Sequence, residues 1–324
     1  MKLQALFRTC TVITSLVITA ISASDSVYAD IVLFGTGPNA FNMDFTTIGS
    51  PGNAADTTGN PNPAGAVSYT YKMGTYEVSE DMITKFNASQ SLQITKDTRG
   101  VNMPATNVSW NEGARFVNWL NTSTGGVAAY KFTTNGVNDD IALWSSTDAG
   151  YNPANLFRNS LATYVLPSMD EWYKAAFYNP ITTTYGAYAT ANGLAPTAVA
   201  SGTGSNTAVF GFQYSQGPAD ITLAGGLSAF GVMGLHGNAF EWNETERDLI
   251  NDSVSAERGL RGGSWDLDSR FLRGYNRGVP AGVNNNVGFR VASLSATAVP
   301  EPGSLVVLSV MGLAGLWSRG RKRK

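Results

Sequence analysis

Two segments of the chain begin with the same helix-start pattern. Ser109 is followed three residues later by Glu112, and Ser168 is followed in the same way by Glu171. In such a capping box, each side chain satisfies a backbone amide of the first helical turn. Apolar residues then recur at helical spacing. The sequence therefore predicts two helices, whose inward residues are Gly113, Phe116, Val117 and Leu120 in the first and Trp172, Ala175 and Ala176 in the second.

The rest of the chain has little sustained periodicity. Ser79 is a suitable N-cap for a third helix, with Met82 and Phe86 spaced for one buried face. Residues 30–66 predict a short strand followed by a mobile loop, and residues 182–229 predict long loops with short strands. The 35 glycines and 13 prolines agree with a loop-rich α+β fold that has few helices.

The N-terminus has the three regions of a secretory signal peptide in order. Lys2 and Arg8 precede an apolar run, and small residues then lead to a cleavage site after Ala29, so residues 1–29 are predicted to be removed. The only cysteine, Cys10, lies in this leader. The exported chain would then contain neither a thiol nor a disulfide, although an oxidising compartment permits both.

The C-terminus combines a Pro-Glu-Pro triplet, an apolar run and an arginine-rich end. The apolar run is shorter than the roughly 20 residues of a full membrane span. The order of the three parts, over residues 299–324, resembles the PEP-CTERM sorting signal of Gram-negative bacteria. That resemblance implies an exosortase-type protease as partner, transient anchoring in the inner membrane, and delivery to the periplasm, cell surface or extracellular matrix. A plain C-terminal anchor is the alternative.

The charge of the exported body excludes one class of partner. Two of the 22 basic residues lie in the leader and five in the tail, whereas only one of the 24 acidic residues is lost with the leader. Residues 30–302 are therefore acidic by about eight charges. A nucleic-acid partner needs a basic face for its phosphates, so none is expected.

Six motifs carry a resemblance over residues 69–293. In chain order they read YEVSEDMITKFN, MPATNVSWNEGARFVNWLN, LPSMDEWYKAA, GVMGLHGNAFEWNETERD, RGLRGGSWDLDSRFLRGYNRG and NNNVGFRVAS. This series is similar to the formylglycine-generating, sulfatase-modifying-factor family, in its PEP-CTERM-associated branch. The resemblance implies an elaborated C-type-lectin-like fold with short twisted sheets, in a domain that we place at residues 67–296.

The family's oxidase chemistry does not transfer to this sequence. The resemblance places the two copper-binding, thiol-exchanging cysteines of the family at Leu267 and Leu272. A leucine can neither bind copper(I) nor form a mixed disulfide, so copper is not expected. The iron-dependent branch needs a histidine-rich domain, and His236 is the only histidine. No catalytic residue is therefore predicted, and the chain is expected to be a ligand-binding module rather than an enzyme.

The segment LRGGSWDLDSRFLRGYNRG at residues 260–278 supplies the candidate ligand site. We expect an arginine-lined groove for an anionic group, such as a uronic acid or a peptide carboxylate. Its candidate residues are Trp265, Asp268, Arg270, Arg273 and Arg277. The alternative is structural, with Trp265 in the core and with Arg273, Arg277 and Arg290 held by carboxylates or loop carbonyls.

The GNAFEW turn supplies a candidate metal site. The resemblance implies calcium bound by Gly237, Ala239 and Glu241, and oxygen ligands in glycine-rich loops suit this ion. A further family ligand falls on Gly234, which has no side chain. The alternative is that Glu241 pairs with an arginine. His236 is expected to be an ordinary surface or turn histidine.

Three functions agree with these patterns. The first is an exported, non-catalytic module that binds a glycan, such as an exopolysaccharide, or a surface protein. The second is an enzyme whose chemistry does not use the missing cysteines. The third is a purely structural matrix protein. A cleft with a perturbed carboxylate would favour the enzyme.

Overall fold

The computed structural model describes residues 30–133, 140–278 and 285–294. The predicted signal peptide and the predicted sorting signal lie outside these residues. None of the helices in the described part of the chain is long and apolar enough to span a bilayer.

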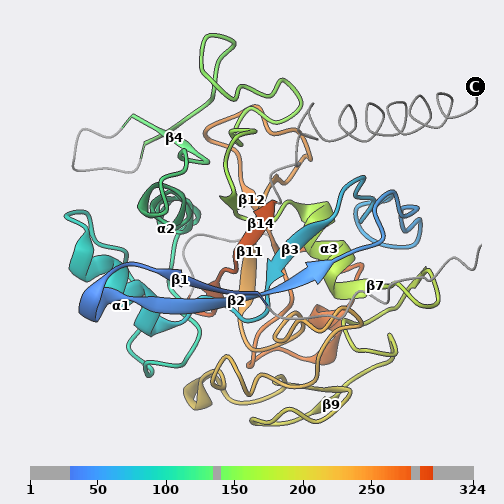
Figure 1. Cartoon of the computed structure of the whole chain (residues 1–324). Helices are drawn as coiled ribbons and strands as arrows, with labels where there is room; N and C mark the ends of the chain where they lie inside the picture. Colours follow the sequence, from blue (N-terminus) through green and yellow to red (C-terminus); the bar gives the residue numbers. More distant parts are fainter. Residues whose placement is uncertain (1–29, 134–139, 279–284, 295–324) are drawn as a thin grey trace, which may run out of the picture.

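A five-stranded antiparallel sheet brings the two ends of the described chain together. Its strands are β1 (Asp30–Phe34), β2 (Phe41–Ile48), β3 (Tyr71–Gly74), β14 (Ala292–Leu294) and β6 (Tyr164–Val165), in that order across the sheet. β1 and β2 cross the front of the molecule in Figure 1. The sequence predicted a single short strand in residues 30–66, but the structure contains two strands there. The second, β2, pairs with β1 on one side and with β3 on the other, and pairing with the distant β3 leaves no local signal in the sequence.

A second sheet carries the two motifs from which the candidate sites were predicted. Its strands are β12 (Arg258–Arg261), β11 (Phe240–Glu246) and β13 (Val287–Gly288), with β11 in the centre. β11 pairs antiparallel with β12 and parallel with β13. The register of β11 and β12 shifts between Trp242 and Glu246, as at a bulge.

The remaining described strands are two residues long. They form the pairs β4 (Lys131–Phe132) with β5 (Ile141–Ala142), β7 (Tyr178–Asn179) with β8 (Thr184–Tyr185), and β9 (Thr197–Ala198) with β10 (Thr207–Ala208). Three short 3₁₀ helices, η1 (Gly37–Asn39), η2 (Tyr214–Gln216) and η3 (Ser269–Leu272), lie in the loops. The predicted α+β fold, with short sheets, few helices and long loops, is confirmed.

The three predicted helices begin at their predicted caps. They are α1 (Glu80–Ser89), α2 (Trp110–Ser123) and α3 (Met169–Phe177). Ser109 accepts from the amide of Glu112 at 3.2 Å, and the Glu112 carboxylate accepts from the amide of Ser109 at 2.8 Å. Ser168 and Glu171 form the same capping box. The inward residues predicted for α2 and α3 are all buried.

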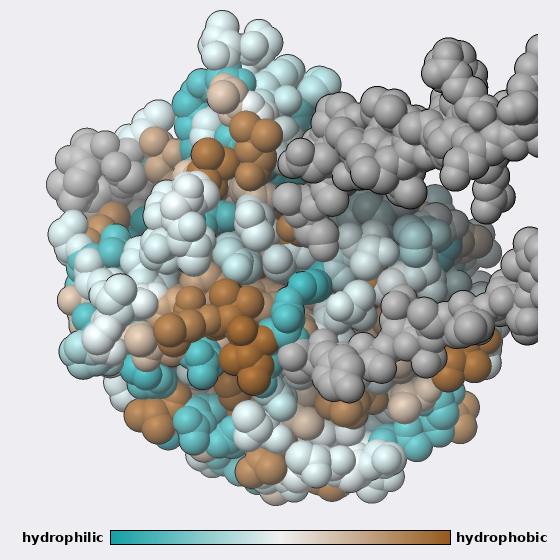
Figure 2. Space-filling model, viewed as in Figure 1, coloured by the Kyte–Doolittle hydropathy of each residue, from teal (hydrophilic) through white to brown (hydrophobic). Residues whose placement is uncertain are grey.

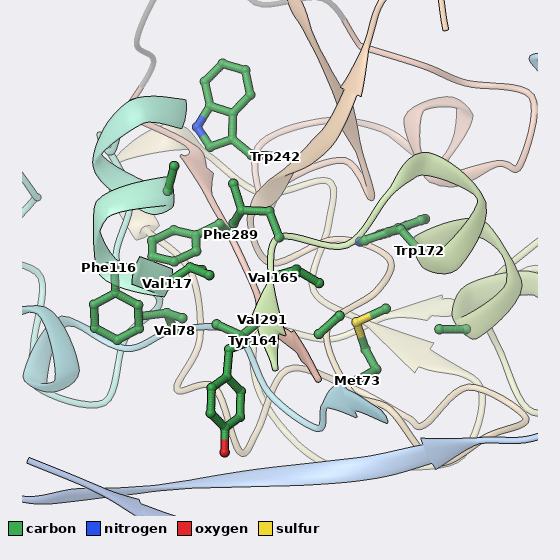
Figure 3. Close-up of a cluster of buried hydrophobic side chains, with 14 of the residues drawn as sticks. Met73, Val78, Phe116, Val117, Tyr164, Val165, Trp172, Trp242, Phe289 and Val291 are labelled. Atoms are coloured by element: carbon green, nitrogen blue, oxygen red, sulfur yellow. The ribbon is translucent and has the colours of Figure 1, made fainter. Parts of the chain in front are cut away.

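The core lies between the helices and both sheets. Figure 3 shows Phe116 and Val117 of α2 on one side and Trp172 of α3 on the other, with Val165 of β6 between them. All four side chains are inaccessible to solvent. This packing holds α2 and α3 in place and fixes the loops that leave the second sheet.

A buried charge network joins the start of α3 to β11. The guanidinium of Arg158 donates to Glu171 at 2.8 Å and to Glu244 at 2.7 Å, and both carboxylates are fully buried. Glu171 is also the capping residue of α3. One side chain therefore caps a helix and neutralises a buried arginine, which ties the helix start to the second sheet.

The surface is polar with scattered apolar areas. Figure 2 shows hydrophobic residues gathered at the front, where β1 and β2 lie in Figure 1. Ile31 and Leu33 of β1 are exposed and point to the same face of the sheet.

Candidate functional site

The five candidate ligand residues do not form one groove. Trp265 is fully buried in a small cluster with Val209 and Ala219. Its indole N–H donates to the carbonyl of Tyr214 at 3.1 Å. Trp265 is therefore part of the core, as its structural alternative predicted, and it offers no surface to a ligand.

Asp268 and Arg270 neutralise each other at the surface. The Asp268 carboxylate caps η3 by accepting from the amide of Arg270, and it also binds the Arg270 guanidinium at 2.7 Å. These hydrogen bonds from Arg270 lower the pKa of Asp268 to about 2. Both side chains are exposed. They form a local ion pair beside η3.

Arg277 ties loops together. Its guanidinium donates to the backbone carbonyls of Glu246 and Arg247, at the end of β11. Burial lowers the pKa of Arg277, with a further contribution from Arg247. The structural alternative, in which loop carbonyls hold this arginine, matches its geometry.

Arg273 differs from the other arginines of the segment. Its Nε donates to the hydroxyl of Tyr188 at 2.7 Å, and its Nη1 donates to the hydroxyl of Tyr275 at 3.3 Å. The guanidinium lies 5.4 Å and 5.6 Å from the centres of these two rings. Within the described chain, no carboxylate forms a salt bridge with Arg273.

A cavity of about 240 Å³ opens beside Arg273. We call it the tyrosine pocket, and its lining residues are Asp56, Thr58, Gly59, Tyr173, Tyr185, Gly186, Ala187, Gly274 and Tyr275. These residues come from α3, β8 and three loop segments, at residues 56–59, 186–187 and 274–275, that lie far apart in the sequence. Tyr275 keeps 48% of its surface exposed, so one ring remains available to a ligand.

Asp56 is the carboxylate of the tyrosine pocket. It accepts from the hydroxyl of Tyr173 at 2.6 Å and from the amide and hydroxyl of Thr58. Burial opposes ionisation of Asp56, but these hydrogen bonds outweigh it and its pKa lies below the usual value. The pocket therefore has a negative side at Asp56, and Arg273 flanks it through its hydrogen bond to the lining residue Tyr275.

A second arginine lies behind the pocket wall. Arg261 is 1% exposed, and its guanidinium lies 4.9 Å from the centre of the Tyr173 ring. It donates to the carbonyls of Gly274, Asn276 and Asn60. Burial lowers its pKa to about 9. Arg261 thus fixes the loops that line the pocket.

The predicted calcium ligand Glu241 belongs to a different, buried cluster. Its carboxylate accepts from Nε of Arg290 at 2.6 Å, from Nη2 of Arg290, and from the indole N–H of Trp172 at 2.6 Å. Glu241 and Arg290 are both fully buried. The alternative prediction, that Glu241 pairs with an arginine, matches this geometry.

The calcium site stays a prediction, and the geometry of Glu241 does not fit it. Both carboxylate oxygens are already hydrogen-bonded, so a calcium ion would have to displace Arg290. Gly234 lies against the same cluster with φ +73°, and a Cβ there would sit 2.9 Å from Oε2 of Glu77. The described residues contain no group of three or more His, Cys, Asp or Glu side chains placed to hold a metal ion.

Glu77 is a functional candidate that the sequence did not reveal. Its carboxylate accepts from Nδ2 of Asn238 at 2.8 Å and from the amide of Ala239 at 3.2 Å. Burial raises the pKa of Glu77 to about 8, and the neighbouring Glu241 carboxylate adds to the shift. The motif YEVSED contains Glu77, but only the fold shows that it lies beside Glu241.

His236 was expected to be a surface or turn histidine, and it lies in a turn but is buried rather than at the surface. It is 1% exposed, in the turn before β11. Burial lowers its pKa to about 4, so the imidazole is neutral at physiological pH.

Leu267 and Leu272, which the resemblance placed at the positions of the family cysteines, pack against other residues. Leu272 is 1% exposed, and a Cβ on Gly263 would lie 2.7 Å from its Cδ2. Leu267 is partly buried against the main core. Gly263 itself has φ +74°, which favours glycine. Apolar packing therefore occupies this part of the segment.

Comparisons with known proteins agree with the fold. Residues 30–294 match the family model of the sulfatase-modifying factor enzyme 1-like domain. The match begins at residue 30, so it includes the segment that we placed before the domain. A search among curated proteins found no match.

Solved structures include several similar chains. Variable protein 1 of Treponema denticola is 20% identical, with a TM-score of 0.56 over 81% of this chain and 98% of that chain. CarF is 18% identical, with a TM-score of 0.48 over 82% of this chain and 97% of that chain. PvdO of Pseudomonas aeruginosa is 16% identical, with a TM-score of 0.48 over 81% of this chain and 97% of that chain. The first similarity supports the elaborated C-type-lectin-like fold. Because the family model covers most of the described residues, the chain belongs to the sulfatase-modifying factor enzyme 1-like family.

Proposed function

We propose that the tyrosine pocket binds a glycan or protein ligand and that the protein is a non-catalytic binding module. The observation that carries this proposal is the combination of an open cavity, the half-exposed ring of Tyr275 and an arginine without a carboxylate partner in the described structure. Aromatic rings and a few convergent polar groups are typical of ligand pockets.

The location of this module is also a proposal, supported by the sequence of both ends. The signal peptide would export the chain, and an exosortase-type protease would process the C-terminal segment after transient anchoring in the inner membrane. The module would then meet its ligand in the periplasm, at the cell surface or in the extracellular matrix. Exopolysaccharides and surface proteins are the ligands present there.

The oxidase chemistry of the resembled family is not part of the proposal. Thiolate chemistry needs cysteine, and the only cysteine in the sequence is Cys10 in the predicted leader. Leu267 and Leu272 instead contribute apolar packing.

An enzyme that works without cysteines is the second candidate, and one observation favours it. Glu77 has a raised pKa and lines a cavity of about 180 Å³ together with Asp44 and Tyr76. However, both oxygens of Glu77 accept hydrogen bonds from the protein, and the residue is 1% exposed. A general acid must reach its substrate within hydrogen-bond distance, so we assign Glu77 to the scaffold.

A binding screen tests the proposed function. The full-length purified protein would be applied to an array of bacterial polysaccharides and to surface proteins, beside the variant Tyr275→Ala. We expect a ligand that binds the wild type and that the variant binds about fivefold more weakly, since an aromatic contact contributes about 1 kcal/mol. The control is Ile181→Ala, which removes a side chain that is 90% exposed and lies outside the pocket. Equal binding by the wild type and Tyr275→Ala would refute the tyrosine pocket as the binding site.

A further inference from the structure

We infer that the tyrosine pocket recognises a uronic acid, with the sugar carboxylate bound by Arg273. This inference rests on the proposed function and goes beyond it by naming the ligand class and its orientation. It follows from four features of the pocket: an arginine without a carboxylate partner, two rings that fix it, a cavity of the right size and an acidic residue opposite.

The first feature is the contrast between Arg273 and the other arginines. Six arginines form salt bridges with carboxylates in the described structure, namely Arg99, Arg158, Arg247, Arg258, Arg270 and Arg290. Arg273 is exposed and donates only to two tyrosine hydroxyls. Among the described residues, none accepts a hydrogen bond from its Nη2. Because a guanidinium has five donors in a fixed fork, Arg273 can still bind an external carboxylate.

The second feature is that Arg273 is fixed before a ligand arrives. The centres of the Tyr188 and Tyr275 rings lie 5.4 Å and 5.6 Å from the guanidinium carbon of Arg273. Both tyrosine hydroxyls accept a hydrogen bond from this guanidinium. A side chain that is already ordered loses less conformational entropy on binding. The guanidinium is therefore prepared for a charge-assisted hydrogen bond, which is about twice as strong as a neutral one.

The third feature is the size and lining of the cavity. Its volume of about 240 Å³ is below the roughly 300–1,000 Å³ of pockets for drug-sized ligands, so it suits a single sugar ring. Tyr275 offers the exposed part of its ring to the apolar face of such a sugar. Gly59, Gly186 and Gly274 also line the cavity. The first and last pack closely on Tyr173, since a Cβ at either would lie within 2.8 Å of the Tyr173 hydroxyl.

The fourth feature sets the orientation of the ligand. Asp56 is ionised and lines the pocket beside Thr58. Both oxygens of Asp56 already accept from Thr58 and Tyr173, so Asp56 acts on a ligand through its charge. It repels another carboxylate, and the acidic end of the ligand is directed to Arg273. A peptide carboxylate would meet Arg273 equally well, but a peptide lacks the sugar ring whose apolar face would pack on Tyr275. The pocket therefore favours a uronic acid over a peptide C-terminus.

Calorimetric titration with three matched sugars tests this inference. The full-length protein would be titrated with the methyl glycoside of glucuronic acid, with the methyl ester of that compound, and with methyl glucoside. We expect the glucuronoside to bind at least about tenfold more tightly than the two neutral sugars. Arg273→Gln should remove this preference while binding to methyl glucoside stays unchanged. Arg247→Gln is the matched control, because Arg247 is exposed, pairs with Glu257 and lies outside the pocket.

The outcomes separate the inference from the proposed function. If the wild type binds the charged and neutral sugars equally, the inferred preference for a uronic acid is refuted, but the pocket is still a sugar-binding site. If only a short peptide with a free C-terminal carboxylate binds, and Arg273→Gln abolishes that binding, the ligand class is refuted and a protein ligand is supported. If neither the sugars nor any ligand of the binding screen is bound, the proposed function itself fails. A thermal unfolding midpoint of Arg273→Gln equal to that of the wild type would show that the variant is folded.

Discussion

Arg290 and Arg273 come from neighbouring parts of the sequence but occupy opposite kinds of environment. Arg290 is fully buried, and Glu241 closes it from one side while carbonyls of Gly74 and Met233 close it from the other. Arg273 flanks the tyrosine pocket, where two hydroxyls hold it in place. The comparison teaches that the partners of an arginine, rather than its place in a motif, show whether it stabilises the fold or can bind a ligand.

The largest effect is expected when the buried cluster of Glu77, Glu241 and Arg290 loses its positive charge, which Arg290 carries. Arg290→Met leaves Glu241 buried without a positively charged partner, next to Glu77, and with only the indole N–H of Trp172 as donor. Breaking a buried pair in this way costs about 3–5 kcal/mol of the free energy of unfolding. Urea unfolding measures the loss, and Arg273→Gln should keep the wild-type midpoint. If both variants were destabilised alike, the distinction between the two arginines would be lost.

A smaller core effect is expected at Leu272. Leu272→Ala removes a side chain that is 1% exposed and packs beside Gly263. Truncation of a buried leucine costs about 2–5 kcal/mol, so the thermal unfolding midpoint should fall clearly. An unchanged midpoint would contradict the structural role of Leu272, and it would reopen this position as part of a site.

The buried cluster should also make stability depend on pH. The folded-state pKa of Glu77, about 8, lies above its unfolded value of 4.5. Glu77 therefore contributes stability that is fully present below pH 4.5 and is lost as pH rises through about 8. The contribution of His236 to stability changes with pH in the opposite direction. Because burial lowers its pKa to about 4, this contribution is lost as pH falls below 6.5. Burial lowers the pKa of Lys174 to about 8, so above that pH its contribution to stability rises with pH. The window in which Glu77 dominates is thus pH 6.5–8, where wild-type stability should fall.

Glu77→Gln tests that assignment because a glutamine resembles the protonated carboxyl. Unfolding midpoints measured across the same pH window should fall less steeply for the variant than for the wild type. Parallel pH profiles for the two proteins would show that another group titrates. The tyrosine pocket should bind its ligand equally well in this variant, since Glu77 does not line it.

Calcium should have the smallest effect. A ligand that binds only the folded state raises the unfolding temperature. Because Arg290 and Trp172 already occupy the carboxylate of Glu241, we expect the same midpoint in calcium and in chelator. A midpoint that rises with calcium would show that the buried cluster can open to an ion, and it would restore Gly237, Ala239 and Glu241 as ligands.

The helices could be predicted from the sequence because their signals are local. A capping box and an apolar stripe lie within a few residues, and both boxes form as expected at Ser109 and Ser168. The sheets could not be predicted in the same way, because β3 pairs with β14 from the far end of the chain. Pairing over such a distance leaves no pattern in either strand alone.

The candidate site was predictable only in part for the same reason. The segment at residues 260–278 contributes Gly274 and Tyr275 to the pocket lining, and Arg273 flanks the pocket through its hydrogen bond to Tyr275. Trp265 and Arg277 serve the fold. The opposite wall comes from Asp56, in a segment expected to be a mobile loop, and from Tyr185. Neither residue has a local signal for function. Only the fold brings them to Arg273.

The most direct test of this account is a nuclear magnetic resonance titration of the full-length protein with the methyl glycoside of glucuronic acid. Glycine amides report on both regions, since Gly59, Gly186 and Gly274 line the tyrosine pocket and Gly234 and Gly237 lie beside the buried cluster. We predict that the sugar shifts the first three signals and leaves the last two unchanged. Shifts confined to Gly234 and Gly237, or no shifts at a saturating concentration, would contradict the account.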